Sequence, residues 1–427
     1  MALNKVYVIT DLGPGDGGKG GVVHKVCDMT SAHTVLKVGG AQGSHGVCTS
    51  AGERFAFSQW GCGTFDGVRT HITNRFVIHP EGILNEANTL QYQCGVHSVF
   101  DLLTVDQRAL CATPYHGIAS RLKELARGNN PRGTIGTGVG QAFRDMQQFP
   151  NLVIRAGDLS LPDIKDRLAV VRENVKEYLD SIIRGEFLPE DRDRADKEIN
   201  LLEDDGFLYY NAKIFREVFQ RANIVDPDFL EREILSKEGV AVVESSHGIL
   251  TDRNCGFHPH TSALDTLPCF THAMLKNAGY DGKIINLGVT RAYAIRHGAG
   301  PMPTDNPKMY ESLLPGSHKE ENRYQGRARV GPLDLVLLKY AIEACDGPTA
   351  FDGLAITWFD QIRVNKAWHV CYRYSTDGVP EIVTHVVSPD AGQEECFSLC
   401  SDVLNASLGV PVRMVSFGPT ERDKLCK

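Results

Sequence analysis

Short runs of β-branched and aromatic residues recur in the first part of the chain, and glycine or polar residues bound each run. Such runs predict short strands, and the first of them predicts a buried one. They cover residues 5–10, 34–38, 55–57 and 70–72. Apolar residues at helical spacing follow the first run at Val22, Val23 and Val26, and a second helix is predicted over residues 81–90.

The later part of the chain has longer helical patterns and one hairpin pattern. Charged and apolar positions alternate at helical spacing over residues 162–184 and 190–222, which predicts two amphipathic helices on the outside of the fold. Residues 368–371 and 382–385 flank a turn at residues 377–380, which predicts a hairpin.

These patterns together define a fold class. Strands that alternate with helices predict an α/β fold, built on a P-loop-like, mostly parallel sheet flanked by helices. The chain has no internal repeat, no low-complexity tract and no clear linker. We therefore expect one large domain over residues 1–427, with peripheral insertions.

A glycine-rich loop follows the first predicted strand and precedes the first predicted helix. In this arrangement, backbone N–H groups and the helix N-terminus can hold a phosphate. Residues 13–19 fit the GxxxxGK half of a phosphate-binding loop, but Gly20 stands where that motif has Ser or Thr, so the usual hydroxyl ligand of magnesium is missing. The Lys19 ammonium and the loop amides are the candidate phosphate ligands. The glycines concerned are Gly15, Gly17, Gly18 and Gly20.

Asp16 is the informative residue of this loop. A carboxylate among phosphate-binding amides repels the substrate unless it binds a metal ion or handles a proton. One interpretation is a turn aspartate that is held by its own backbone. The other is a carboxylate that faces the transferred phosphoryl group. Lys19, three residues later, favours the second, because a turn needs no such lysine.

A second predicted strand also ends in a glycine-rich loop, residues 39–46, which contains His45. Two parallel strands that each end in such a loop predict one crevice at the carboxyl edge of the sheet. A lone loop histidine is commonly an exposed side chain without a role. Beside a second phosphate-type loop, however, His45 is a candidate general acid or electrophile.

Composition narrows the class of protein. The 427 residues carry a net charge of −8 and have a pI near 6.0, which argues against nucleic acid as the main partner. No apolar stretch is long enough for a membrane span, so we expect no membrane partner. Twelve scattered cysteines without a CxxC pair, and no signal peptide, indicate reduced thiols in a cytoplasmic protein without structural zinc.

Blocks of sequence along nearly the whole chain resemble, in the same order, the adenylosuccinate synthetase family, the GTP-dependent ligases of AMP synthesis. Residues 15–21 read GDGGKGG against GDEGKGK in the family, and residues 39–46 read GGAQGSHG against GGxNAGHT. The later blocks are GTIGTGVGQAF at 133–143, VVESSHG at 242–248, RAYAIRHGAGPMPT at 291–304, GRARVGPLD at 326–334, GVPV at 409–412 and SFGP at 416–419. One such motif can arise by chance, but an ordered set does not.

The resemblance implies a reaction and roles for the loop residues. Asp16 would take the N1 proton of a 6-oxopurine nucleotide so that O6 attacks the γ-phosphate of GTP, and His45 would stabilise the phosphorylated oxygen as an acid. The amino group of aspartate would then displace phosphate. Lys19 and the loop amides would hold phosphates, while Asp16 and the carbonyl of Ser44 would bind Mg²⁺. This chemistry needs mostly positioning and charge neutralisation.

The nucleobase site departs from the family pattern. Where the family reads guanine with TKLD, this chain has TWFD at residues 357–360. Asp360 can accept hydrogen bonds from the base, and Trp358 can either stack on the base or pack in the core. The resemblance places Ser416 and Gly418 in the same nucleotide site. GTP is the expected nucleotide, and ATP or a deoxynucleotide is the alternative.

The amino-acid loop differs as well. The family has a Thr pair before its arginine cluster, whereas residues 323–326 read RYQG here. Arg327 and Arg329 remain and can clamp a carboxylate, or they can form a solvated basic loop. Aspartate is the favoured amino acid, but the lost hydroxyls leave the amine donor open.

The purine-nucleotide site is rebuilt more extensively. The family's Asn and Gln are Gln42 and His247 here, and its Val is His297. The implied substrate residues are Gln42, Thr134, His247, Ser262 and His297, with Thr261 as the alternative to Ser262. A single histidine at one of these places would commonly be structural. Two together indicate a pocket for another purine, such as a guanine nucleotide.

The resemblance also implies a homodimer, although the arginine that reaches across the family's dimer has no clear equivalent. Residues 146–150, MQQFP, occupy its place, and Arg144 lies nearby. The main hypothesis is a GTP-dependent ligase that joins IMP and aspartate to give adenylosuccinate, GDP and phosphate. The alternatives are the same chemistry on GMP or dGMP or with another amine donor, and a non-catalytic nucleotide-binding paralogue. The presence of Asp16, Lys19 and His45 argues against a non-catalytic paralogue.

Overall fold

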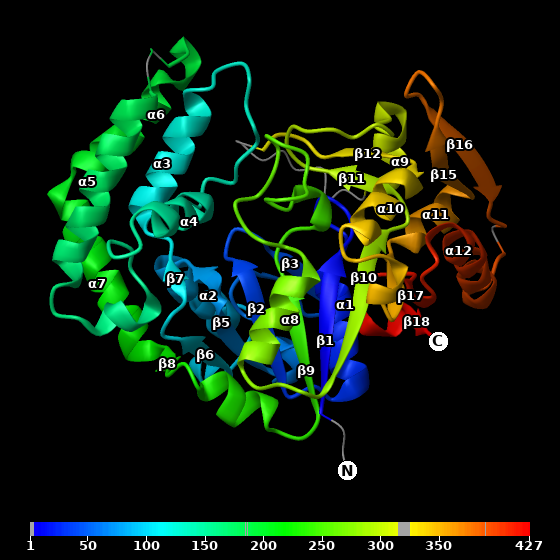
Figure 1. Ribbon diagram of the computed structural model, residues 1–427, viewed down its shortest axis with the longest axis horizontal. Helices are drawn as coiled ribbons and strands as arrows, with labels where there is room; N and C mark the ends of the chain where they lie inside the picture. The colour runs from blue at the N-terminus through cyan, green and yellow to red at the C-terminus, as the bar shows by residue number, and fades with distance from the viewer. Residues whose placement is uncertain (1–3, 184, 186, 315–324, 389) are drawn as a thin grey trace.

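An eleven-stranded sheet runs through the described part of the computed structural model, which is residues 4–183, 185, 187–314, 325–388 and 390–427 (Figure 1). The strand order is β18-β17-β14-β10-β1-β9-β2-β5-β6-β8, and β7 pairs with β5. All of these pairs are parallel except β17 with β18. The strands are β1 Lys5–Asp11, β2 Thr34–Gly40, β5 Arg69–Ile78, β6 Leu103–Asp106, β7 Leu110–Cys111, β8 Asn223–Val225, β9 Val240–Ser245, β10 Lys283–Arg291, β14 Gly353–Thr357, β17 Val412–Ser416 and β18 Lys424–Cys426.

Helices cover both faces of this sheet (Figure 1). They are α1 Lys19–Thr30, α2 Pro80–Tyr92, α3 Pro114–Leu125, α4 Val139–Gln148, α5 Ile164–Ile182, α6 Arg192–Glu203, α7 Asp205–Arg221, α8 Pro268–Asn277, α9 Tyr310–Leu313, α10 Leu335–Glu343, α11 Phe359–Asn365 and α12 Gln393–Leu408. In β1, Val8 packs with α8 on one face, whereas Ile9 packs with Val22 of α1 on the other. The alternation of side chains along a buried strand therefore produces the layers.

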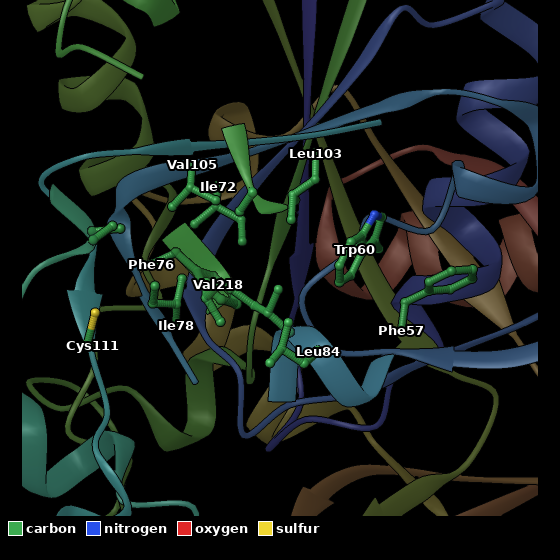
Figure 2. Close-up of a cluster of buried hydrophobic side chains, with 14 of the residues drawn as sticks. Phe57, Trp60, Ile72, Phe76, Ile78, Leu84, Leu103, Val105, Cys111 and Val218 are labelled. Atoms are coloured by element: carbon green, nitrogen blue, oxygen red, sulfur yellow. The ribbon is translucent and has the colours of Figure 1, made fainter. Parts of the chain in front are cut away.

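The end of the sheet that contains β5 and β6 packs in one large hydrophobic cluster. Figure 2 shows Ile72, Phe76 and Ile78 of β5 beside side chains of β6, α2 and α7. Trp60 is fully buried in this cluster, and its indole N–H donates to the carbonyl of Val99 at 3.1 Å. Burial of this apolar surface is the main force that fixes β5 and β6 beside β2.

The predicted strands and most predicted helices are confirmed, but residues 190–222 do not form one helix. They form α6 and α7, and the break lies at Asp204. The carboxylate of Asp204 accepts from the N–H of Gly206 at 2.7 Å, so it caps the start of α7. An aspartate favours such a cap over a helix interior, because its side chain competes for backbone N–H groups.

Peripheral elements complete the fold. The predicted hairpin is β15 Ala367–Tyr374 with β16 Pro380–Val386, and it lies at the opposite end of the molecule from α5, α6 and α7 (Figure 1). The remaining strands are β3 His45–Cys48, β4 Arg54–Phe57, β11 Ala294–Arg296, β12 Arg329–Gly331 and β13 Leu333–Asp334. Short helical turns occur at η1 Thr64–Asp66, η2 Val99–Leu102, η3 Ala156–Ser160, η4 Pro189–Asp191, η5 Leu230–Leu235, η6 Ile249–Thr251, η7 Pro307–Met309, η9 Pro348–Ala350 and η10 Glu421–Asp423.

Over the described residues, every helix is too short or too polar to cross a bilayer. All twelve cysteines are free.

Six neighbouring parallel strands end at the same edge of the sheet. In spatial order these are β17, β14, β10, β1, β9 and β2. Their last residues are Ser416, Thr357, Arg291, Asp11, Ser245 and Gly40. The predicted crevice between the loops after β1 and β2 therefore has a third wall, because β9 lies between these two strands and contributes the loop that contains His247.

Candidate active site

The first glycine loop is organised by Asp11, the last residue of β1. Its carboxylate accepts from the N–H groups of Gly13 and Gly17, both at 2.8 Å, and from Nζ of Lys19 at 2.9 Å. A Cβ at Gly17 would lie 2.7 Å from this carboxylate, so only glycine allows the close approach. The N–H of Gly17 is thus engaged within the protein, whereas the sequence indicated it as a phosphate ligand.

Lys19 joins the first loop to the loop after β9. Its side chain is only 3% exposed, and Nζ donates to the carbonyl of His247 at 2.7 Å as well as to Asp11. A buried ammonium needs such partners, because an unpaired charge in a low-dielectric site is costly. Direct contact between Lys19 and a phosphate stays a prediction.

Asp16 lies at the turn of the first loop with a left-handed backbone, at φ 60°. Its carboxylate is 45% exposed, and Oδ2 lies 2.5 Å from Nδ1 of His297. Partial desolvation acts to raise the pKa of Asp16, but the hydrogen bond and the charge of His297 outweigh it and hold the pKa below its ordinary value. Asp16 therefore faces the residues of the predicted purine site.

His45 is oriented by a buried carboxylate. Its Nδ1 lies 2.7 Å from Oε1 of Glu244, and Nζ of Lys37 donates to the same oxygen at 2.7 Å. The other oxygen, Oε2, accepts from the N–H of Cys62 at 2.9 Å. Burial acts to raise the pKa of Glu244, but Lys37 and His45 hold it well below its ordinary value. Because Nδ1 of His45 is engaged, Nε2 is the nitrogen that can face a substrate.

The pKa of His45 itself is lowered. Burial is the main cause, and the hydrogen bond to Glu244 opposes it. Cys62 lies close enough to His45 and Glu244 for the three to be considered as ligands of a metal ion. Lys37 argues against this, because its ammonium occupies the carboxylate oxygen that a cation would need.

The second loop lies against the first. A Cβ at Gly20 would lie 3.0 Å from the Cβ of His45, so the start of α1 and the start of β3 are in close contact. Ser44, whose carbonyl is the predicted second metal ligand, is exposed. Carboxylate and carbonyl oxygens are the donors that a small divalent cation prefers, so Asp16 and Ser44 fit such an ion by their chemistry.

Two of the predicted purine-site residues contact each other, and a third contacts Asp16. Nε2 of Gln42 contacts Nε2 of His247, and His297 contacts Asp16. Burial, followed by the charge of Lys19, lowers the pKa of His247 to about 4, so this imidazole is neutral near pH 7. The charges of Asp16 and His45 both act on that pKa, so His247 lies near both residues.

Two further loops lie near His297. Gly133 packs on Gly298, since a Cβ at Gly133 would lie 2.7 Å from Cα of Gly298, and this brings the loop of Thr134 to the site. The hydroxyl of Thr134 bonds to Ser120 at 3.2 Å. The loop of Ser262 is linked through the carbonyl of His260, which accepts from Arg296 at 3.1 Å.

The arginine expected from a partner subunit has no replacement in Arg144. The Arg144 guanidinium donates to Asp145 at 2.6 Å and lies 3.3 Å from the ring centroid of Tyr178. It is held within its own chain.

The predicted nucleobase residues lie after β14 and β17, which are neighbours in the sheet. The hydroxyl of Thr357 donates to the carbonyl of Gly17 at 2.6 Å and ties β14 to the first loop. Trp358 lies under the guanidinium of Arg291, with 4.5 Å between Cζ and the ring centroid. Asp360 accepts from Gln361 at 2.7 Å, and Ser416 donates to the carbonyl of Gly418 at 2.8 Å.

The two predicted amino-acid ligands have different environments. Arg327 is 60% exposed, and its guanidinium lies over the ring of Tyr310 at 4.0 Å. Arg329 donates to the carbonyls of Gly298 and Gly300 at 3.1 and 2.7 Å, so it also fixes the loop that follows His297. Arg323 and Tyr324, which replace the family's hydroxyls, lie outside the described residues.

Two cavities lie beside the loops. The larger, of about 260 Å³, is lined by residues that include Gly39, Arg75, Ser246 and Asp265. A smaller one of about 50 Å³ lies behind the first loop and is bounded in part by Leu337 of α10. Neither cavity is lined by Asp16 or His45. These two candidate catalytic residues therefore lie on the glycine loops, outside both cavities.

Sequence patterns missed four residues that organise this site. They are Asp11, Lys37, Glu244 and Arg291. Each is a charged side chain at 5% exposure or less within or at the end of a central strand. A charge inside an otherwise apolar strand is the signal that could have identified them, because such a charge must find a buried partner.

The mostly parallel sheet, the glycine loops at its carboxyl edge and the buried carboxylate that orients His45 are typical of a nucleotide-binding α/β enzyme. A family model described as adenylosuccinate synthetase matches residues 8–398. The chain belongs to the adenylosuccinate synthetase family, and it is a ligase that forms C–N bonds.

Curated relatives agree with this assignment. The adenylosuccinate synthetase of Chlorobium chlorochromatii is 30% identical over 379 residues, which cover 85% of this chain and 78% of the relative. That of Dehalococcoides mccartyi is 27% identical over 368 residues, covering 85% and 80%.

Solved structures share the fold. Fully ligated adenylosuccinate synthetase from Plasmodium falciparum matches with a TM-score of 0.78 at 17% identity, over 100% of both chains. The succinoaminodeoxyadenylate synthetase of cyanophage S-2L, bound to dGMP and dATP, matches with a TM-score of 0.62 at 16% identity, over 99% of this chain and 95% of that one.

Proposed function

We propose that the chain is a GTP-dependent ligase that phosphorylates O6 of IMP and replaces it with the amino group of aspartate, giving adenylosuccinate, GDP and phosphate. The observation that carries this proposal is the presence, at one edge of the sheet, of a half-exposed Asp16 and of a His45 whose ring is oriented by Glu244. The two lie on loops after β1 and β2, parallel strands that flank β9 and end at the same edge. Proton transfer and phosphoryl transfer on one small substrate require such groups on loops that lie close together.

In this mechanism, the Asp16 carboxylate takes the proton from N1 of the purine. The N1–H group takes the place of His297 at Oδ2, so His297 must give up its present contact. The electron pair moves to O6, which attacks the γ-phosphorus of GTP, and the bond to the β-phosphate breaks. In its imidazolium form, His45 keeps Nδ1–H on the Glu244 carboxylate, and Nε2–H is the group that can donate to the new phosphoryl oxygen. The aspartate amine then attacks C6, and phosphate leaves with the C6–O6 bond broken.

Mg²⁺ is the proposed cofactor. The carboxylate of Asp16 and the carbonyl of Ser44 would hold it, since both are oxygen donors that Mg²⁺ prefers. When bound, it neutralises charge on the phosphates during transfer.

The remaining substrate-binding residues are proposed from the loops on which they lie. Lys19 and the amides of Gly15, Gly18 and Gly20 would serve the phosphates, and Trp358, Asp360, Ser416 and Gly418 would serve the guanine base. Arg327 and Arg329 would clamp the carboxylates of aspartate. A homodimer in the cytoplasm is part of the proposal, and size-exclusion chromatography with light scattering tests its assembly.

A guanine nucleotide is the second candidate for the purine substrate. The buried amide oxygen of Gln42 has no hydrogen-bond partner among the described residues, and a guanine presents an exocyclic amino group that could fill this position. Gln42 also contacts the neutral His247. The pocket therefore has polar groups beyond those needed for hypoxanthine.

A substrate panel tests both candidates. IMP, GMP and dGMP are each combined with twenty amino acids and with GTP or ATP, and phosphate release is measured. Release that requires IMP, aspartate and GTP together supports the main proposal, and release with GMP or dGMP favours the second candidate. Asp16→Ala should abolish release under every condition. Tight GTP binding without release in any combination would instead indicate a non-catalytic paralogue.

A further inference from the structure

Arg291 connects the catalytic loop to the nucleobase end of the site. It is the last residue of β10, and only 5% of it is exposed. Its Nε donates to the carbonyl of Asp16 at 2.5 Å, and one terminal nitrogen donates to the hydroxyl of Tyr293 at 2.8 Å. The same guanidinium lies over the indole of Trp358, at 4.5 Å from Cζ to the ring centroid.

The contact with Asp16 fixes a strained backbone. A non-glycine residue in the left-handed region is strained, so the surrounding structure must hold it there. Asp16 has φ 60°, its carbonyl is held by Arg291, and the next carbonyl, that of Gly17, is held by the hydroxyl of Thr357. These two bonds set the plane of the loop and thereby the direction of the Asp16 carboxylate.

The contact with Trp358 gives Arg291 its second role. Trp358 follows Thr357 directly and precedes α11, which carries Asp360 in its first turn. Trp358 itself has φ 60°, so its indole is placed by a specific backbone turn. A base that moves this indole also changes the surface on which the guanidinium of Arg291 rests.

We propose that Arg291 is a positioning residue that couples occupation of the nucleobase end, through Trp358, to the backbone of Asp16. The inference rests on the proposed function for the roles of Asp16 and Trp358. Arginine suits this position because its planar group stacks on an aromatic face while its edge donates hydrogen bonds, which a lysine ammonium cannot do at once.

The kinetic test compares Arg291→Lys and Arg291→Met with Trp358→Leu and the double variant Arg291→Met/Trp358→Leu. We expect kcat to fall about 10-fold in Arg291→Lys and about 100-fold in Arg291→Met, with KM for the amino acid within about twofold. Coupling predicts that Trp358→Leu lowers kcat in the wild type but has little further effect in Arg291→Met. Wild-type kcat in Arg291→Lys, or fully additive effects in the double variant, would overturn the proposal.

Arg221→Met is the matched control. Arg221 also stacks on an aromatic ring, that of Phe100, with the same 4.5 Å from Cζ to the centroid, but it lies on α7. It reports the effect of losing a stacked arginine on the fold as a whole. Its kcat should equal that of the wild type.

A binding test separates this inference from the proposed reaction. Guanosine has the base without phosphates, so it occupies the nucleobase end alone, and adenosine serves in a parallel arm. In the wild type, saturating nucleoside should slow hydrogen exchange of the amides of Gly13 and of residues 15–18. Arg291→Met should lose this protection, while calorimetry shows that it still binds. Absence of protection in the wild type would overturn the coupling. If the substrate panel gives no product but the protection is present, the proposed function fails and the coupling stands.

Discussion

The loops after β1, β2 and β9 differ sharply from the loop around Arg327 in the environment of their lysine and arginine side chains. In the first region two lysines are buried in ion pairs: Lys19 and Lys37 are at most 3% exposed and lie within 2.9 Å of Asp11 and Glu244, respectively. In the second region, Arg327 is 60% exposed, with a carboxylate oxygen of Glu311 4.0 Å away. The same kinds of charged side chain therefore occupy two very different environments.

This difference separates charged groups that are held in fixed positions for the reaction from charged groups that can adjust to the ligand they bind. Buried, fully bonded charges hold their dipoles in place before the substrate arrives, and the low dielectric strengthens each interaction. Exposed charges are screened by water and salt, and they reorient at little cost. We infer that the first region sets the reaction and that the second selects the amino acid.

The largest effect is expected for Asp16→Asn. The amide has the size of the carboxylate, but it neither accepts a proton nor carries charge, so kcat should fall by about 10³-fold or more. Phosphate release with IMP, aspartate and GTP measures this. Because the side chain is half exposed, the urea midpoint of unfolding should stay near that of the wild type. Near-normal turnover would remove the proposed mechanism.

Lys19→Met tests whether the first region depends on its buried pairs. The variant leaves Asp11 buried without its cation, and the free energy of unfolding should fall by about 3–5 kcal/mol. Urea denaturation gives the value, and calorimetry with GTP tests whether triphosphate binding is lost as well. Asp11→Asn/Lys19→Met should recover part of the stability, because no lone charge remains. A loss below about 1 kcal/mol in the single variant would contradict the importance of the pair.

Glu244→Gln should lower kcat by about 100-fold, because the amide no longer fixes the protonated Nδ1 of His45. It also leaves Lys37 without its counter-charge. The double variant Glu244→Gln/Lys37→Met separates the two effects, since it should regain stability without regaining kcat. Recovery of both together would mean that Glu244 acts only on the fold.

Arg327→Ala probes the second region. The exposed guanidinium contributes little to the fold, so the free energy of unfolding should change by less than about 0.5 kcal/mol. KM for aspartate should rise about 10-fold, because one charged bond to a carboxylate is lost. Arg327→Lys should recover part of this loss. An unchanged KM would indicate that Arg327 belongs to a solvated basic loop.

The smallest effect concerns pH and a residue outside both regions. Burial lowers the pKa of His71 to about 4, against an ordinary value of 6.5. Between these values the unfolded chain binds more protons than the folded one, so the contribution of His71 to stability is present above pH 6.5 and is lost as the pH falls toward 4. His71→Phe, which can retain the stacking on Phe229, should flatten the slope of unfolding free energy against pH by up to one proton. An unchanged slope would mean that groups other than His71 cause the loss of stability at acidic pH.

The elements that sequence patterns predicted are those with a local cause. The run from Lys5 to Thr10 could only be a buried strand, and the glycines after it could only be a close-approach loop. The break at Asp204 was missed, since helical spacing continues through it and only the cap interrupts the helix. The single domain over residues 1–427 stays a prediction, and one cooperative unfolding transition would support it.

The order of residues by itself determined the strands, the two glycine loops and the candidate pair of Asp16 and His45, because each of these depends on neighbours a few positions away. Only the tertiary structure decided that Glu244 orients His45, that Asp11 engages Lys19 and the amide of Gly17, and that Arg291 holds the backbone of Asp16. Glu244 and Arg291 lie about two hundred positions or more from their partners, and strand order alone brings them together. A buried charge must find a partner, but the fold chooses which one.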